Sequence, residues 1–209
     1  MACHPGNNIP AMATRESPPT DPDRGILERV AGGDTESFAV LVERHQGRLV
    51  RLCQRLLHSH GEAEEVTQEV FLEAFRRASS FKPHGKVYTW LYRIAVNRCL
   101  KRLRRRRIVR FLGFGELESS DAEDGRLFEP VDMDAPDAEA RLEARRRWQT
   151  TRQHIEALPA GQRAVLILAK LEGLSYREIA ETLDITEGAV ESRLFRAMRT
   201  LTRRKGPTP

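Results

Sequence analysis

Apolar residues recur every three or four positions along most of the chain, which is the spacing of amphipathic α-helices. In the first half this pattern runs through residues 25–56, and a glycine-rich break at residues 32–34 divides it into two helices. Asp34 is expected to cap the second of them. A further break at residues 58–61 precedes a third helix, expected over residues 61–78. The pattern therefore predicts a bundle of helices in this half of the chain.

A fourth helix is expected from about Val87, and its two halves differ in chemistry. The first half concentrates aromatic and aliphatic side chains, among them Tyr88 and Trp90, whereas residues 98–110 hold eight bases and no acid. Aromatic rings followed by cations suit single-stranded DNA, because bases stack on the rings and phosphates meet the positive charge. Trp90 can equally be a core residue, and the basic run can be a solvated segment. Since like charges repel, the run favours an anionic partner.

Residues 141–204 predict four more helices, and the last two have the pattern of a helix-turn-helix. Ser175 and Glu178 have the spacing of a capping box at the start of a short helix. A tight turn at residues 184–185 leads to Thr186, which is expected to cap a longer basic helix. Such a pair is typical of DNA-binding domains; an ordinary helical hairpin with a basic face is the alternative. The part of the basic helix expected to face a groove of DNA carries Ser192, Arg193, Phe195, Arg196 and Arg199.

Four glutamates of the third helix step by three, four and four residues, so they share one face. This acidic face, expected to be exposed, is either solvated or a docking surface for a basic partner. Its members are Glu62, Glu65, Glu69 and Glu73.

The fold class expected from these elements is all-α, with two small helical domains joined by a flexible acidic linker. The content of 40% hydrophobic and 6% aromatic residues fits small helical domains better than a large sandwich or barrel core. The expected division is a disordered tail over residues 1–23, an N-terminal helical bundle over 24–112, the linker over 113–138 and a four-helix helix-turn-helix domain over 139–206.

Charge is distributed along the chain in blocks. The net charge is +5 over 209 residues, but residues 24–110 carry +10, residues 111–140 carry −9 and residues 141–209 carry +6. Basic blocks favour nucleic acid as a partner. The acidic block has little apolar periodicity, which is typical of a linker.

Cysteine usage and hydropathy indicate a cytoplasmic protein. Cys3, Cys53 and Cys99 are far apart in the sequence, so a disulfide framework is not expected and a reducing compartment is. No run approaches the roughly 20 apolar residues that span a bilayer, and the N-terminus lacks the apolar stretch of a signal peptide, so membrane insertion is not expected. No cofactor and no metal site is expected, because Cys3 and His4 have no further ligands nearby.

Three sets of motifs together resemble one protein family. They are residues 62–72, residues 88–97, and the C-terminal segments 158–159, 173–180 and 187–197, in this order and with an acidic segment before the last set. Over about residues 24–206 the chain is similar to the extracytoplasmic-function (ECF), sigma-E-like sigma factors of bacterial RNA polymerase. The resemblance implies a transcription-initiation factor and not an enzyme, with sigma region 2 in the N-terminal domain and sigma region 4 in the C-terminal domain.

The resemblance also implies partners and site residues. The expected partners are core RNA polymerase, promoter DNA as −35 duplex and −10 non-template single strand, and an anti-sigma factor. Polymerase binding is expected at Glu62, Glu65, Gln68 and Glu69. Recognition of the −10 element is expected at Tyr88, Trp90, Asn97, Arg98, Lys101, Arg102, Arg104 and Arg105, and recognition of the −35 element at Ser192, Arg193, Phe195, Arg196 and Arg199.

Some features of the chain leave its finer behaviour open. Glu191 stands where the family usually has a base, and Met198 replaces a frequent arginine, so the detailed −35 preference is not fixed by the resemblance. The family's linker threads a positively lined channel that later holds nascent RNA, which would make the −9 of residues 111–140 an electrostatic mimic of RNA. A plain tether is the alternative.

Two other function classes compete with the sigma-factor interpretation. A stand-alone helix-turn-helix regulator would explain residues 141–209 but not the aromatic-basic helix or the acidic face. An enzyme acting on nucleic acid would need paired acids at cation-binding spacing, a phosphate-cradling glycine loop or a nucleophile with a nearby base, and none is found.

Overall fold

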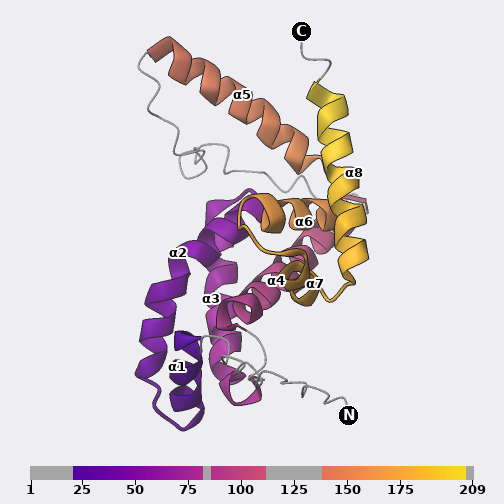
Figure 1. Ribbon diagram of the computed structural model, residues 1–209. Helices are drawn as coiled ribbons and strands as arrows, with labels where there is room; N and C mark the ends of the chain where they lie inside the picture. Colours follow the sequence, from indigo (N-terminus) through magenta and orange to yellow (C-terminus); the bar gives the residue numbers. More distant parts are fainter. Residues whose placement is uncertain (1–20, 82–85, 112–137, 206–209) are drawn as a thin grey trace, which may run out of the picture.

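A computed structural model describes residues 21–81, 86–111 and 138–205, and in these ranges all regular secondary structure is helical (Figure 1). This confirms the all-α fold class. The expected tail, apart from its last residues, and nearly the whole expected linker lie outside the described residues. The helices are α1 (Pro22–Ala31), α2 (Ser37–Leu57), α3 (His60–Arg76), the 3-10 turn η1 (Ala78–Ser80), α4 (Val87–Phe111), α5 (Ala138–Glu156), α6 (Ala160–Lys170), α7 (Tyr176–Leu183) and α8 (Glu187–Lys205).

Helices α1 to α4 form the N-terminal domain around one apolar core. Each fully buried leucine or valine there contributes about 1.5–3 kcal/mol relative to an exposed position. Phe38 of α2 lies edge-on to Phe71 and Phe75 of α3, with ring centroids 6.2 and 5.2 Å apart. The residues buried between α2, α3 and α4 include Leu41, Leu49, Leu52, Leu56, Val66, Val70 and Leu91.

The breaks between these helices lie close to their predicted places. Glu36 occupies the N-cap position of α2, two residues after the expected cap Asp34. The Asp34 carboxylate nevertheless accepts a hydrogen bond from the Ser37 amide at 3.2 Å. His58 ends α2 in the left-handed conformation (φ 59°), and the Ser59 hydroxyl accepts from the Glu62 amide at 3.3 Å to cap α3. The second break is therefore two residues long, because α3 already includes the residues after Ser59.

The first turn of α4 is held by a residue that precedes α1. The Asp21 carboxylate accepts hydrogen bonds from the Asp23 amide at 3.1 Å and from the Val87 amide at 2.6 Å. Asp23 in turn is buried, where it contacts Arg44 and, at 2.7 Å, the His45 ring of α2. The starts of α1 and α4 are thus fixed to each other and to α2.

Helices α6, α7 and α8 form the C-terminal domain and confirm the helix-turn-helix. Ser175 and Glu178 make both hydrogen bonds of the capping box. Asp184 ends α7 in the left-handed conformation (φ 56°), and the Thr186 hydroxyl accepts from the Ala189 amide at 3.2 Å. The residues buried between these helices include Val165, Leu168, Ile179, Val190 and Ala197.

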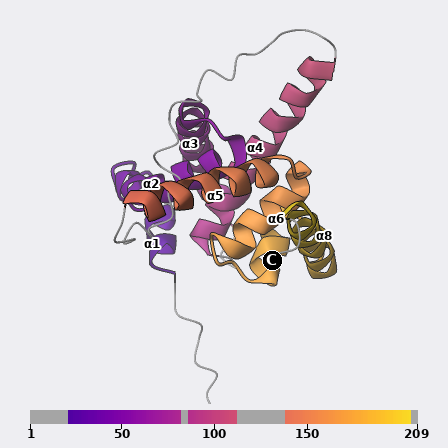
Figure 2. The same ribbon diagram turned by 90° about the horizontal axis from the view of Figure 1, so that it is seen from above.

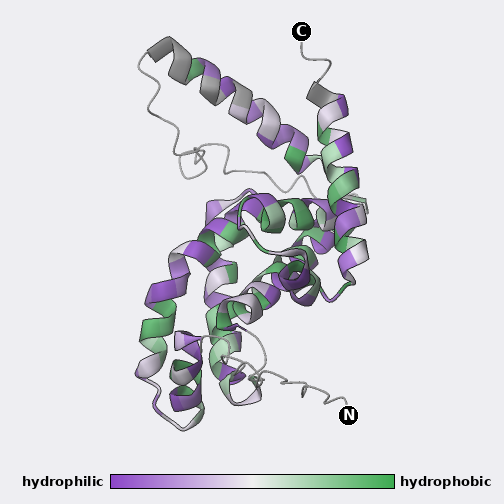
Figure 3. Cartoon of the chain, in the orientation of Figure 1, coloured by the Kyte–Doolittle hydropathy of each residue, from purple (hydrophilic) through white to green (hydrophobic). Residues whose placement is uncertain are grey.

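The two helical domains are in contact, although a linker was expected to separate them. Helix α4 lies against α7 and α6, and α2 lies against α6 (Figures 1 and 2). The C-terminal end of α4 extends beyond the other helices in the view from above (Figure 2). Helix α5 approaches α8 near its own C-terminal end and carries hydrophilic residues along most of its length (Figure 3). The interdomain contact is therefore made by α2, α4, α6 and α7.

Candidate nucleic-acid interface

The acidic face of α3 and the basic run of α4 are partners of each other. The two helices run antiparallel, and arginines four residues apart on α4 meet the glutamates of α3 in order. The ion pairs are Arg106–Glu62, Arg102–Glu65 at 3.0 Å, Arg98–Glu69 and Arg98–Glu73 at 2.7 Å. We call these pairs the α3–α4 ladder. The expectation of an exposed acidic stripe is thus wrong in part, since α4 covers one side of it.

The ladder divides the basic run of α4 into two sets. Arg98, Arg102 and Arg106 are half-buried and face α3. Lys101, Arg104, Arg105 and Arg107 are exposed on the remaining faces. Of the expected −10 residues in this run, Lys101, Arg104 and Arg105 are therefore free to meet an anion, whereas Arg98 and Arg102 are engaged within the domain.

A groove lies beside Asn97, at the junction of α3, α4 and α7. Its volume is about 950 Å³. Asn97 is exposed in this groove, Trp90 stands at its side with its ring 5.2 Å from that of Phe81, and both rings are half-buried. The basic side chains that line the groove are Arg77, Lys86, Arg93, Arg98, Lys101 and Arg177. The expected −10 residues Trp90, Asn97, Arg98 and Lys101 are brought together here.

The expected groove-facing residues of α8 lie on its outer side. Ser192, Phe195, Arg196 and Arg199 are exposed, and the Phe195 side chain keeps 65% of its accessible area. Arg193 differs, because it is half-buried and its guanidinium lies over Gly161 of α6, within 3.4 Å of where a Cβ would be. Four of the five predicted residues are therefore free to approach a duplex, and Arg193 sits at the edge of their surface.

A second groove, of about 560 Å³, lies between α2 and α3 on the side away from the ladder. Gln68 is exposed in it, and Leu72 and Phe75 border it although 56% and 40% of their areas are accessible. Sequence reasoning missed Leu72 and Phe75. The sequence contained a signal for Leu72. This apolar residue directly follows the core residue Phe71, so it lies outside the face of α3 that forms the core.

Two family models match the chain, Sigma-70 region 2 over residues 41–108 and Sigma-70 region 4 over residues 150–201. The chain is 36% identical over 183 residues to the RNA polymerase sigma-H factor of Pseudomonas aeruginosa, covering 84% of this chain and 89% of that protein. It is 35% identical over 176 residues to the ECF RNA polymerase sigma-E factor of Escherichia coli, covering 84% and 90%. The chain belongs to the ECF sigma factors. Region 2 of this sigma factor comprises α2 to α4, and region 4 comprises α6 to α8 with the end of α5.

Two solved structures share this fold. CnrH in complex with the cytosolic domain of CnrY superposes with a TM-score of 0.59 at 25% identity, covering 87% of this chain and 95% of that one. RpoE of Bartonella quintana in complex with the anti-sigma factor NepR superposes with a TM-score of 0.63 at 22% identity, covering 83% and 99%. Family membership identifies the chain as a sigma factor of RNA polymerase, which excludes both the nucleic-acid enzyme and the stand-alone regulator.

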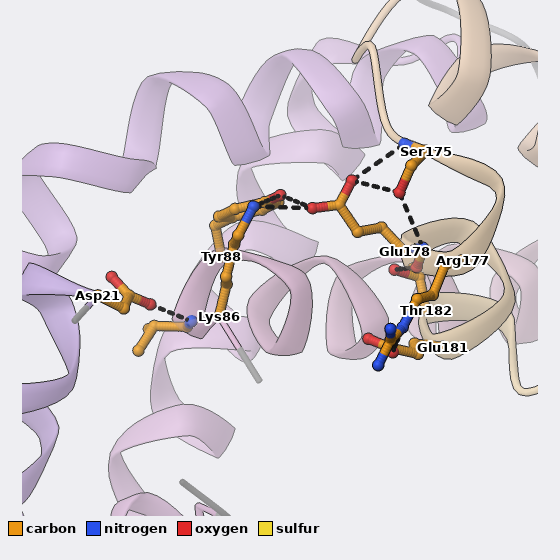
Figure 4. A network of polar contacts seen from close by, with 9 residues as sticks. Asp21, Lys86, Tyr88, Ser175, Arg177, Glu178, Glu181 and Thr182 are labelled. Carbon is orange, nitrogen blue, oxygen red and sulfur yellow. Dashed lines mark hydrogen bonds and ion pairs between the residues drawn. The ribbon is translucent and has the colours of Figure 1, made fainter. Parts of the chain in front are cut away.

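The contact between regions 2 and 4 of this sigma factor was not predicted from the sequence, although two of its residues, Tyr88 and Glu178, were selected for other roles. Glu178, known from its capping box, also accepts hydrogen bonds from the Tyr88 hydroxyl and from Lys86 Nζ at 3.0 Å (Figure 4). The Tyr88 hydrogen bond, with those of Ser175 and Lys86, outweighs burial and lowers the pKa of Glu178 to about 2. Glu172 accepts from the Tyr92 hydroxyl at 2.9 Å and contacts Arg55.

His58 adds a further contact at the far end of the same interface. Its ring lies 3.0 Å from Arg163 of α6 and 3.2 Å from the Glu156 carboxylate of α5. Burial, followed by the charges of Arg163, Arg152 and Arg106, lowers the pKa of His58 to about 3. The ring is therefore neutral near pH 7, so its contact with Glu156 does not join two full charges.

Proposed function

We propose that the groove beside Asn97 holds the melted non-template strand of the −10 element. The observation that carries this assignment is the meeting of an exposed amide, a half-buried indole and several cations in one groove. An amide can read a base edge, an aromatic ring can stack on a base, and cations meet the phosphates. Lys101, Arg104 and Arg105 continue the positive surface along α4. Tyr88 lies in the first turn of the same helix. Arg98 and Arg102 support the surface by holding α4 against α3.

Substitution of Asn97 tests this assignment. The Asn97→Ala factor is assayed in holoenzyme with 2-aminopurine at successive −10 positions of the non-template strand, and melting is followed by fluorescence. We expect slower opening or an altered preference at one −10 base, with the affinity for −35 duplex unchanged. An opening profile identical to that of the wild type at every position would refute the role of Asn97.

The exposed face of α8 is the proposed reader of the −35 duplex. Ser192, Phe195 and Arg196 project from the half of α8 that follows the turn, which is the part of a helix-turn-helix that enters the major groove. Arg199 lies one turn further on and is placed to meet the backbone. Arg193 lies over α6 and reaches DNA only if its guanidinium turns outward.

The α2–α3 groove is the proposed docking surface for core polymerase. Its Gln68 and the exposed Leu72 and Phe75 form an apolar patch with a polar rim, and such a patch on a soluble protein marks an interaction site. Glu65 lies on the ladder side of α3, next to this groove side, and keeps much of its exposure. Glu62 and Glu69 act on the same surface through the ladder, by fixing the orientation of α3.

A charge placed in the α2–α3 groove should prevent polymerase binding. Leu72→Asp is expected to weaken the holoenzyme at least about 10-fold, equivalent to about 1.4 kcal/mol. The matched control is Val40→Asp, which puts the same charge on an exposed apolar position of α2 that does not line the groove. Equal affinities of the two variants for core polymerase, measured by fluorescence anisotropy, would contradict the assignment.

An anti-sigma factor is the remaining proposed partner, and the cytoplasm the proposed location. The solved relatives named above were determined with CnrY and with the anti-sigma factor NepR, which supports a comparable partner for this chain. Core polymerase acts in the cytoplasm, which supports the location. Among the helices of the described ranges, none has the length and apolar character to cross a membrane.

A further inference from the structure

The carboxylate of Glu178 serves two structures at once. It closes the capping box of α7 with Ser175, and it joins α7 to the first turn of α4 through Tyr88 and Lys86 (Figure 4). The Lys86 ammonium also lies 3.4 Å from the Tyr88 hydroxyl, so the three groups form one network. Hydrogen bonding to Glu178 raises the pKa of Lys86. Lys86 and Glu178 therefore both remain charged near neutral pH.

Glu172 makes the second and more deeply buried part of the contact. Its side chain is 10% exposed, and it contacts Tyr92 and Arg55, which both belong to region 2. A carboxylate this deeply buried is costly unless it is paired and hydrogen-bonded. Within region 4 it stands in the loop between α6 and α7. Its placement is thus best explained by the presence of region 2.

The contact covers the −10 side of the factor and leaves the −35 side open. Lys86 and Tyr88 are engaged at the start of α4, and Arg93 lies 3.5 Å from Asp184 at the end of α7. Arg177 of α7 lines the groove that contains Asn97. By contrast, the outer face of α8 is turned away from region 2, and its predicted DNA-facing residues other than Arg193 are exposed.

We propose that region 4 closes the free factor over its own −10 surface, with the carboxylate of Glu178 competing against the DNA strand for the first turn of α4 and that of Glu172 holding the closed form together. The inference rests on the proposed assignment of α4 to the −10 strand. Carboxylates and phosphates accept the same charge-assisted hydrogen bonds from lysine, arginine and tyrosine donors. Region 4 is therefore an internal competitor of nucleic acid, and opening of the two regions precedes −10 binding.

A contact made by a few side chains can hold regions 2 and 4 together because the two regions are on one chain. Joining two domains gives an effective concentration in the millimolar range, so a pairing that is weak between separate molecules is well populated within one. If the open form is about a tenth of the population, the apparent affinity for the −10 strand falls about 10-fold. The exposed Lys86–Glu178 pair makes the closed form sensitive to salt, because added ions screen it.

The test uses the full chain with Glu172→Gln and Glu178→Gln combined. Glutamine is accepted at the third position of a capping box, so α7 keeps its start while the charge is removed. The matched control is Glu36→Gln with Glu43→Gln, which removes two charges from exposed positions of α2 outside the contact. Thermal melting by circular dichroism verifies that each variant is folded.

Two readouts separate closure from DNA binding. Small-angle X-ray scattering should show a larger radius of gyration for the interface variant than for the wild type and control. Fluorescence anisotropy with a labelled −10 single strand should show binding roughly 10-fold tighter for the interface variant, and −35 duplex affinity should change less than about twofold.

Each alternative outcome overturns a distinct part of the inference. An unchanged radius of gyration refutes closure by these carboxylates. An enlarged radius with unchanged −10 affinity refutes competition with DNA. If holoenzymes of all three proteins bind no −10 strand, the assignment of α4 fails and the inference fails with it.

Discussion

Helices α4 and α8 are both basic and both proposed to bind DNA, yet their charges are used in different ways. On α4, three arginines are paired with α3 and the first turn is engaged by region 4. On α8, the arginines at 196 and 199 are exposed. A duplex can be read by a rigid, exposed helix, whereas a melted strand needs a groove whose walls are held in place. The difference shows that a count of basic residues does not measure the charge available to DNA.

Charge reversal within the ladder should have the largest effect on stability. Glu69→Lys removes a partner of Arg98 and places two like charges together. We expect a loss on the order of 1–3 kcal/mol, as for hydrogen bonds to charged groups, and a melting temperature lower by roughly 4–8 °C per kcal/mol for a small domain.

Glu64→Lys provides the control for this experiment. Glu64 lies on α3 but is exposed, and it contacts His60 of the same helix at 3.3 Å. Its reversal should change the melting temperature little. If both variants melt alike, the ladder does not stabilise region 2 and the contrast between α4 and α8 is lost.

Arg196→Ala should give the opposite result, with DNA reading affected and stability unchanged. An arginine bonded bidentately to guanine gives about 1–3 kcal/mol of discrimination between bases. We expect specificity to relax at one or two −35 positions in a competition assay with all single-base variants of the element. Preserved discrimination at every position would show that Arg196 contacts only the backbone.

Glu191→Lys tests whether the exposed face of α8 meets the phosphates of the −35 duplex. Glu191 is exposed beside the proposed reading residues, and the added cation should neutralise about one phosphate. The slope of log affinity against log salt should then steepen by about 0.9 for −35 duplex. An unchanged slope would place position 191 away from the DNA backbone.

The smallest expected effect is a weakening of the interdomain contact by acid. The pKa of Glu178 is lowered from 4.5 to about 2, first by the hydrogen bond of Tyr88, so the contact is favoured above pH 4.5 and is lost as pH falls toward 2. Energy transfer between dyes on regions 2 and 4 should be constant between pH 6 and 8 and should fall below pH 4.5. Glu178→Gln should flatten this decline, and an unaltered decline in that variant would assign the acid response to other groups.

Much of the fold follows from local patterns in the sequence. The capping box at Ser175, the turn at Asp184 and the start of α4 at Val87 are all where the sequence predicts them. These features depend on neighbours a few residues away, so their residue types are informative by themselves. The first cap of α2 was displaced by two residues because Asp34 bonds the Ser37 amide from a turn that precedes the helix.

The ladder and the interdomain contact could not be predicted in the same way. Periodicity shows which residues share a face of a helix, but it does not show which face of another helix they meet. The acidic face of α3 and the basic run of α4 were each assigned to outside partners, although their spacings match when the helices run antiparallel. Glu172 and Tyr92 are 80 residues apart, and no local signal links them.

The hydrogen bond from the Val87 amide to Asp21 bears on where the N-terminal domain begins. The family match to region 2 begins at residue 41, and the bundle was expected to begin at residue 24. The acceptor that fixes the first turn of α4 nevertheless lies at residue 21, ahead of both. A fragment that begins at residue 24 or at residue 41 would leave the Val87 amide without this acceptor, and we expect the first turn of α4, its proposed strand-binding end, to fray. If α4 binds the strand as proposed, a working fragment must therefore begin at or before Asp21.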